Sequence, residues 1–120
     1  MIRGIGTDIV EIARIRKAVQ RESFLHRVFT EKEIAAYRLK GQRAQTLAGF
    51  FAAKEAFAKA LGTGFRGFSF RDIEVQTDKQ GKPFLTLSEH LLSFVPAFQN
   101  ISVSIAHSNQ NAIAFVILEE

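Results

Sequence analysis

The chain has no cysteine and no tryptophan, and it has only one tyrosine and two prolines among 120 residues. Without cysteine, a disulfide framework, a thiol nucleophile and a thiolate metal site are all excluded. No apolar run is long enough to cross a bilayer, and the first residues lack an apolar segment followed by a small-residue cleavage site. We therefore expect a soluble cytoplasmic protein without a membrane partner.

Phenylalanine and positive charge are what the chain has in quantity. Twelve Phe residues and a hydrophobic fraction of 47% are ample for a core, and the length predicts a single domain over residues 1–120. The 16 Lys and Arg residues exceed the 12 Asp and Glu residues, which gives a formal net charge of +4. Such a chain favours an anionic partner, whether a phosphorylated small molecule, an acidic protein, a nucleic acid or a membrane surface.

Hydrophobic periodicity and turn signals predict an α+β fold in which a mainly antiparallel sheet packs against a long helix. The expected strands cover residues 2–10, 71–77, 84–87, 101–107 and 112–118, and the expected helices cover residues 11–20, a segment from residue 30, 42–61 and 88–94. Thr30 and Glu33 have the spacing of a capping box. The last strand is apolar at both parities, so both of its faces should be covered, and a second subunit could supply one cover.

The long helix carries two charged residues that a core helix does not need. Glu55 and Lys59 are four residues apart and therefore share a face. Ala48, Ala52 and Gly62 lie on the same face, and their small size predicts space there for something other than protein. The more ordinary interpretation is an exposed ion pair worth about 0.3–0.5 kcal/mol.

Asp8 ends a strand whose same-side neighbours are Gly4 and Gly6, where another backbone or a ligand can approach closely. The common alternative is that Asp8 caps the helix that follows. Together with Glu55, it would supply two hard carboxylates, which suit Mg²⁺ when phosphate oxygens and waters complete the coordination. His107 lies at the exit of its strand, where a hydrogen-bonded structural histidine and a ligand contact are both reasonable.

The helix expected at residues 11–20 has one apolar and one basic stripe. Arg14, Lys17 and Arg21 form the basic stripe at spacings of three and four residues. Its usual meaning is a solvated face, but its single sign of charge also fits a docking surface for an acidic partner.

Three blocks of the sequence together resemble the bacterial holo-acyl-carrier-protein synthases, the small type of 4'-phosphopantetheinyl transferase. They are GIGTDIVEI at residues 4–12, FAAKEAFAKALGTG at residues 51–64, and ISVSIAH with the following hairpin and strand at residues 101–116. The GKP at residues 81–83 also fits. The blocks occur in the family's order and span nearly the whole chain. The resemblance implies a 4'-phosphopantetheinyl transferase-like fold and a homotrimer with active sites between subunits.

The resemblance also implies a reaction. A member of this family transfers the 4'-phosphopantetheine group of coenzyme A to a serine of apo acyl carrier protein, releases adenosine 3',5'-bisphosphate and serves fatty acid biosynthesis. By position, Asp8 and Glu55 would bind Mg²⁺, and Lys59 would lie near the diphosphate as a candidate acid for the leaving group. The base for the serine stays open: Glu55 through a metal-bound water is preferred, with Asp8 or a metal hydroxide as alternatives.

The remaining site residues follow from the same resemblance. It implies coenzyme A contacts at Gly62, Gly64, Lys82, Pro83 and His107. It also implies that the basic first helix, with Arg14, Lys17 and Arg21, docks the acidic carrier protein.

One position departs from the family pattern. Phe50 stands where a basic residue associated with the coenzyme's phosphates is common, and Arg43 or Lys40 is the candidate replacement.

Two other classes of function compete with the transferase. A basic RNA- or ribosome-binding module fits the net charge, but the scarcity of Tyr and Trp leaves no evident base-stacking platform, so we expect no nucleic-acid partner. The second competing class is an adaptor that binds the carrier protein without catalysis. The presence of Asp8, Glu55 and Lys59 argues against it.

Overall fold

The computed structural model describes all 120 residues and has the expected α+β architecture. Its helices are α1 (Ile12–Ala18), α2 (Glu22–Val28), α3 (Glu31–Leu39), α4 (Ala44–Leu61) and α5 (Glu89–Leu92), with a 3-10 turn, η1 (Phe70–Asp72). Its strands are β1 (Ile2–Glu11), β2 (Ile73–Thr77), β3 (Pro83–Leu87), β4 (Asn100–His107) and β5 (Asn111–Glu119). None of the helices combines the length and the apolarity that a membrane span requires.

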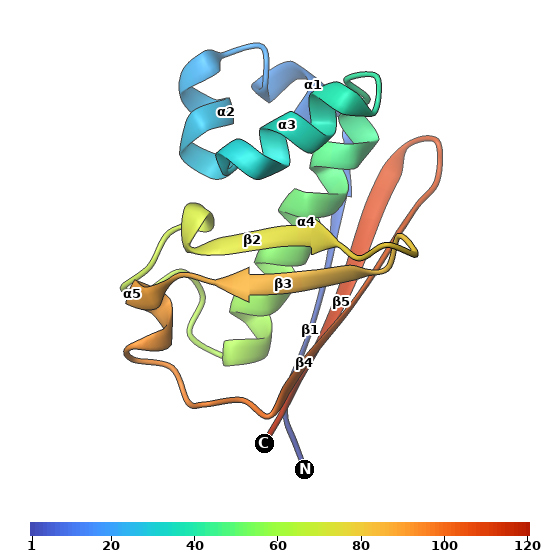
Figure 1. Ribbon diagram of the computed structural model, residues 1–120. Coiled ribbons are helices and arrows are strands. Elements are labelled where there is room, and N and C mark those ends of the chain that lie inside the picture. Colours follow the sequence, from blue (N-terminus) through green and yellow to red (C-terminus); the bar gives the residue numbers. More distant parts are fainter.

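The strands form two antiparallel sheets on different sides of α4. One sheet has the order β1-β5-β4, and the other is the β2–β3 hairpin. Figure 1 shows the hairpin crossing α4, while α1, α2 and α3 gather at the end where α4 begins. The chain ends meet, because the Met1 amino group donates a hydrogen bond of 3.0 Å to the Glu120 carbonyl. Both sheets pack against the long helix α4.

The sequence of α4 explains its central position. Thirteen of its 18 residues are buried, and they lie around the whole circumference instead of forming one stripe. A helix that is apolar all round is stable only when other elements cover it on several sides. The α4 helix ends at Leu61 and is capped by Gly62, which adopts the left-handed conformation with φ 82°.

The small residues of β1 and α4 allow the two elements to pack closely, which differs from the role expected for them. A methyl group at Gly6 would overlap the carbonyl oxygen of Ala56, and one at Gly4 would overlap that of Ala60. Ala48 and Ala52 are also fully buried. The space beside Ala48 and Ala52 is therefore filled by neighbouring protein, whereas Gly62, the third small residue of the expected face, has nothing within 4 Å of an added methyl group.

Several element boundaries differ from the sequence-based expectation. The helix expected to begin at residue 42 begins at Ala44, because Gly41 and Gln42 both have positive φ values, 80° and 53°. The strand expected from Arg71 begins at Ile73, after η1. The seven-residue helix α2 was not predicted, and its N-terminus lacks a side-chain cap. The Thr30–Glu33 capping box is confirmed.

The two faces of β5 differ in burial. Ala112, Ala114, Val116 and Leu118 face α4 and are buried, whereas Ile113 and Phe115 on the other face are each 43% exposed. A single chain thus covers only one face of this apolar strand.

Candidate functional site

Asp8 and Lys59 form the centre of the site. Asp8 lies within β1, opposite Ala114, and its side chain is only 15% exposed. Lys59, in the last turn of α4, donates hydrogen bonds to the Asp8 carboxylate at 3.0 Å and to the Thr7 carbonyl at 3.1 Å. The predicted pairing of Lys59 with Glu55 is replaced by this cross-element pair, because β1 lies directly on α4.

The alternative that Asp8 caps the first helix is wrong. The N-cap position of α1 belongs to Glu11, whose side chain makes no capping hydrogen bond. Asp8 instead continues the ladder with β5, three residues before that position. Its carboxylate therefore does not cap a helix and instead accepts the hydrogen bond from Lys59.

Glu55 adds a second carboxyl group to this centre. It is half-buried, and burial raises its pKa above the ordinary value for glutamate. The negative charge of Asp8 raises the pKa further, while Lys59 and Arg14 act in the opposite direction. Glu55 and Asp8 are thus close enough to repel each other, and two cations from two helices partly compensate that repulsion.

This donor set fits a magnesium ion. The chain has no cluster of three or more His, Cys, Asp or Glu side chains, so an all-protein cage is absent. Magnesium does not need one, because it keeps several waters and commonly takes one or two carboxylates plus substrate phosphates. A divalent cation between Asp8 and Glu55 would also remove the repulsion that raises the Glu55 pKa.

His107 shares the sheet face of Asp8. The register pairs His107 with Ala112, and Ala112 with Val10, so all three side chains project toward the α4 side. Two strand spacings separate β4 from β1, about 10 Å. His107 is exposed, and its ring Nδ1 lies 3.2 Å from the Ser108 carbonyl. It is therefore available to a ligand that extends from Asp8 across the end of the sheet.

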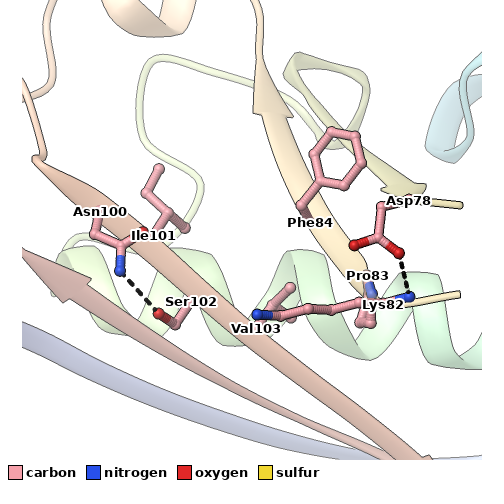
Figure 2. Close-up of a pocket in the computed structure, with 8 residues that line it drawn as sticks. All are labelled: Asp78, Lys82, Pro83, Phe84, Asn100, Ile101, Ser102 and Val103. Carbon is pink, nitrogen blue, oxygen red and sulfur yellow. Dashed lines mark hydrogen bonds between the residues drawn. The ribbon is translucent and has the colours of Figure 1, made fainter. Parts of the chain in front are cut away.

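Lys82 and Pro83 border a pocket between the β2–β3 hairpin and β4. In Figure 2 the Lys82 side chain extends across this pocket toward β4. The backbone of Lys82 is fixed by a 2.9 Å hydrogen bond from its N–H to the Asp78 carboxylate. The pocket has a volume of about 280 Å³ and is lined by Asp78, Lys82, Pro83, Phe84, Asn100, Ile101, Ser102 and Val103. Of these, the β4 residues were not predicted as ligand contacts, although Ile101, Ser102 and Val103 belong to the ISVSIAH block.

The other predicted coenzyme contacts are widely separated within one chain. Arg43 precedes the first residue of α4, while Gly62 and Gly64 follow its last residue, and an 18-residue helix is about 27 Å long. Both glycines have positive φ, 82° and 66°. Phe50, at the position where the family commonly has a basic residue, is a buried core residue that is 7% exposed. One chain therefore does not bring Arg43 together with the two glycines.

The basic stripe on α1 is present as predicted. Arg14, Lys17 and Arg21 are exposed or partly exposed and surround a shallow hollow with Gln20. None of the three forms an ion pair within the chain. Because Arg14 also acts electrostatically on Glu55, this stripe adjoins the carboxylate centre.

The family model described as the 4'-phosphopantetheinyl transferase superfamily matches residues 4–116. The chain belongs to this superfamily. Among curated relatives, the holo-[acyl-carrier-protein] synthase of Clostridium botulinum (strain Eklund 17B / Type B) is 54% identical over 121 residues, which cover 99% of this chain and 98% of the relative. That of Clostridium beijerinckii is 51% identical over 121 residues, with the same two shares.

Solved structures of the superfamily agree in fold. The holo-[acyl-carrier-protein] synthase from Neisseria meningitidis has a TM-score of 0.92 at 38% identity, over 100% of both chains. The Bacillus anthracis synthase, solved in complex with CoA (3',5'-ADP), has a TM-score of 0.83 at 42% identity, over 100% of this chain and 98% of that chain. These comparisons confirm the resemblance, the fold class and the transferase class predicted from the sequence.

Proposed function

We propose that this chain transfers the 4'-phosphopantetheine group of coenzyme A to a serine of apo acyl carrier protein and releases adenosine 3',5'-bisphosphate. The superfamily and the names of its close relatives support this reaction. The observation that carries it in this chain is the grouping of Asp8, Glu55 and Lys59 at the β1–α4 contact. The catalytic domain spans residues 1–120, and the reaction serves fatty acid biosynthesis in the cytoplasm.

Asp8 and Glu55 would hold Mg²⁺ against the diphosphate of coenzyme A. When bound, the ion supplies Lewis-acid stabilisation of the phosphoryl oxygens. Phosphoryl transfer otherwise needs mainly positioning and neutralisation of charge. Lys59, 55% exposed and within reach of the same centre, places a positive charge where the departing phosphate gains negative charge.

Glu55, acting through a water, is the proposed base for the serine hydroxyl. General bases work best when their pKa is near the working pH, and burial raises the Glu55 pKa in that direction, while a bound cation would offset the further contribution of Asp8. Asp8 is the weaker candidate because its carboxylate already accepts a hydrogen bond from Lys59.

The coenzyme would extend from the carboxylate centre toward the hairpin pocket and the end of β4. Lys82 and Pro83 at the hairpin pocket and His107 at the end of β4 are the proposed contacts for its nucleotide end. Gly62 and Gly64 present backbone without side-chain hindrance, since nothing lies within 4 Å of a methyl built at either position. Arg43 is the proposed substitute for the basic residue that Phe50 replaces.

The acyl carrier protein would dock on α1 through Arg14, Lys17 and Arg21. The three basic side chains are unpaired, and Arg14 acts electrostatically on Glu55, so an acidic helix bound there would bring its serine to the carboxylate centre. The outer face of the β1-β5-β4 sheet, with Ile9, Ile113 and Phe115 exposed, is the proposed subunit contact of a homotrimer.

Mass spectrometry of an apo acyl carrier protein tests the reaction. The carrier is incubated with this protein, coenzyme A and Mg²⁺, and we expect a mass gain of one phosphopantetheine. A carrier with its acceptor serine replaced by alanine should gain nothing, and neither should the complete mixture with excess chelator. Asp8→Ala and Glu55→Ala should each abolish transfer while circular dichroism shows an intact fold. Binding of coenzyme A without any mass gain would contradict the proposal.

A further inference from the structure

A buried ion pair lies next to the carboxylate centre and belongs to none of the proposed ligand contacts. Lys54, the residue before Glu55, and Glu33 of α3 both have side chains that are 0% exposed. The Lys54 Nζ lies 2.7 Å from the Glu33 Oε1 and also donates a 2.7 Å hydrogen bond to the Val28 carbonyl. Helix α4 is therefore joined to both α2 and α3 through one ammonium group.

Glu33 extends the connection to the hairpin. Its Oε1 also accepts the Thr30 N–H at 2.9 Å, and its Oε2 accepts the Val75 N–H of β2 at 2.7 Å. No buried side-chain nitrogen or oxygen in the chain lacks a hydrogen-bond partner. One charged pair thus links the end of α2, the start of α3, the middle of α4 and the strand β2.

Stability alone is a weak reason for such a pair. Removing two charges from water costs free energy that their attraction only partly returns, and an apolar pair of the same volume is often equally stable. Burial accordingly moves both groups toward their neutral forms, raising the pKa of Glu33 and lowering that of Lys54. The ion pair makes directional hydrogen bonds that join four segments of the chain, and an apolar pair would make none.

We propose that the Lys54–Glu33 pair positions the active site by fixing the rotation of α4, and with it Glu55 beside Asp8, while tying the β2–β3 hairpin to the same helix. Lys54 and Glu33 are positioning residues, because they reach the reacting groups only through their neighbours. The ligands named in the test rest on the proposed function, whereas the geometric claim does not.

The geometry of α4 links the orientation of Lys54 to that of Glu55. Consecutive residues of an α-helix project about 100° apart, so an α4 helix that points Lys54 at Glu33 necessarily points Glu55 to another side. On that side, β1 contacts the helix backbone at Ala56 without intervening side chains. The helix is thus held by β1 on one side and by the ion pair on the other, and a loss of the pair leaves its rotation set by apolar contacts alone.

Lys54→Met tests the connection to the metal carboxylates. It keeps all but one atom of the side chain's length and removes its charge and hydrogen bonds. The matched control is Leu118→Ala, a core truncation on β5 opposite Gly4, four rows from the pairing of Asp8 with Ala114. Both variants should lose thermal stability. Manganese binding, measured from the free-ion resonance, should weaken about 10- to 100-fold in Lys54→Met and stay unchanged in the control.

Glu33→Gln tests the connection to the hairpin and is the milder change. Its single acceptor oxygen can still serve Lys54 and Thr30, but its NH₂ group then faces the Val75 N–H, and that bond is lost. We expect faster hydrogen exchange at the Val75 amide and coenzyme A binding about tenfold weaker, with a normal maximal rate at saturating coenzyme A.

The outcomes separate positioning from stability. If Lys54→Met binds manganese as tightly as wild type while losing as much stability as Leu118→Ala, the pair is structural and the proposal is overturned. Unchanged coenzyme A binding in Glu33→Gln, or failure of both variants to fold, overturns it as well. Manganese binding and amide exchange require no turnover, so these results remain informative if the carrier assay shows that the proposed function is wrong.

Discussion

The carboxyl group of Glu55 is half-buried beside the negative charge of Asp8, and both effects favour its protonated form. A carboxyl group whose pKa is raised by folding binds a proton more tightly in the folded chain than in the unfolded chain. It therefore destabilises the fold increasingly as the pH rises from its unfolded pKa through its folded pKa. At neutral pH this residue works against stability in a metal-free protein.

Glu55→Gln should accordingly be more stable than wild type at pH 7 in the presence of chelator, because the amide mimics the protonated acid. We expect a few tenths to about 1 kcal/mol, since solvent screens a half-exposed group. The difference should disappear at a pH below the ordinary pKa of glutamate. Urea unfolding at several pH values measures it. A variant less stable than wild type at pH 7 would show that burial and the repulsion from Asp8 do not disfavour the ionised form of Glu55.

Lys59→Ala should affect the rate more than the binding of coenzyme A. If the ammonium group stabilises charge on the leaving phosphate, its loss lowers kcat by more than it raises KM. Its exposed ion pair with Asp8 should contribute no more than about 1 kcal/mol to folding, so the variant should fold normally. Steady-state kinetics decide the role. A rise in KM with kcat unchanged would make Lys59 a binding residue only.

The sequence indicated the site residues better than their partners. Asp8, Glu55 and Lys59 were recognisable from motif and spacing, and the structure brings them together. The Asp8–Lys59 pair joins residues 51 positions apart, which no local spacing reveals. Lys54 was overlooked for a physical reason: a lysine between apolar helix residues looks solvent-exposed until a buried carboxylate from another helix is known to meet it.

At the scale of elements, β1 and α4 pack with their backbones in direct contact. Gly6→Ala should force the two backbones apart, because the methyl group would overlap main-chain atoms of Ala56 and Ala60, which cannot move independently. We expect a loss of about 1–3 kcal/mol and a large loss of activity, since Asp8 lies on the same strand.

Gly49→Ala is the matched control for that substitution. Its methyl group would meet only a side-chain atom, the Cγ2 methyl of Ile105 at 2.9 Å, and alanine is favoured over glycine within a helix by about 1 kcal/mol. Thermal denaturation and turnover of both variants make the comparison. Equal stability of the two variants would show that the glycine of β1 does not set the distance between strand and helix.

The basic stripe of α1 supports a prediction about association. Charge reversal of Lys17 and Arg21 to Glu should slow binding of the acyl carrier protein and leave coenzyme A binding nearly unchanged. Added salt should slow the wild-type association too, because exposed charges are screened over about 8–10 Å at physiological ionic strength. Binding kinetics at two salt concentrations measure both effects. If neither salt nor charge reversal changes the rate of carrier association, the stripe is an ordinary solvated face.

Elements were predictable where their signals are local. The capping box of α3, the Ser88 cap of α5 and the turn before β3 all form as their residue types indicate. Helix α2 was missed because seven residues without a side-chain N-cap give little periodicity, and it is held by tertiary contacts such as the Lys54 bond to Val28. The start of α4 was misplaced because the positive φ of Gln42 is uncommon for a residue other than glycine.

At the scale of the whole molecule, a single chain leaves one apolar face of its sheet exposed and holds the proposed coenzyme contacts far apart. Ile5, Ile9, Ile113 and Phe115 are all exposed by 43% or more on the face of the sheet that points away from α4. A contiguous apolar face of this kind marks an interaction surface. The separation of Arg43 from Gly62 by the length of α4 agrees with a coenzyme site that needs residues from two chains.

Phe115→Asp should therefore disrupt both assembly and activity. We expect wild-type protein to form a homotrimer in light scattering, and the variant to give a smaller species with weak coenzyme A binding. Leu39→Asp is the matched control, because Leu39 is 88% exposed on α3, outside the apolar sheet face. It should leave mass and activity unchanged. If the proposed coenzyme contacts come from two chains, dilution of the wild-type protein should lower its specific activity as the oligomer dissociates, and a fully active monomer would show that one chain builds the site alone.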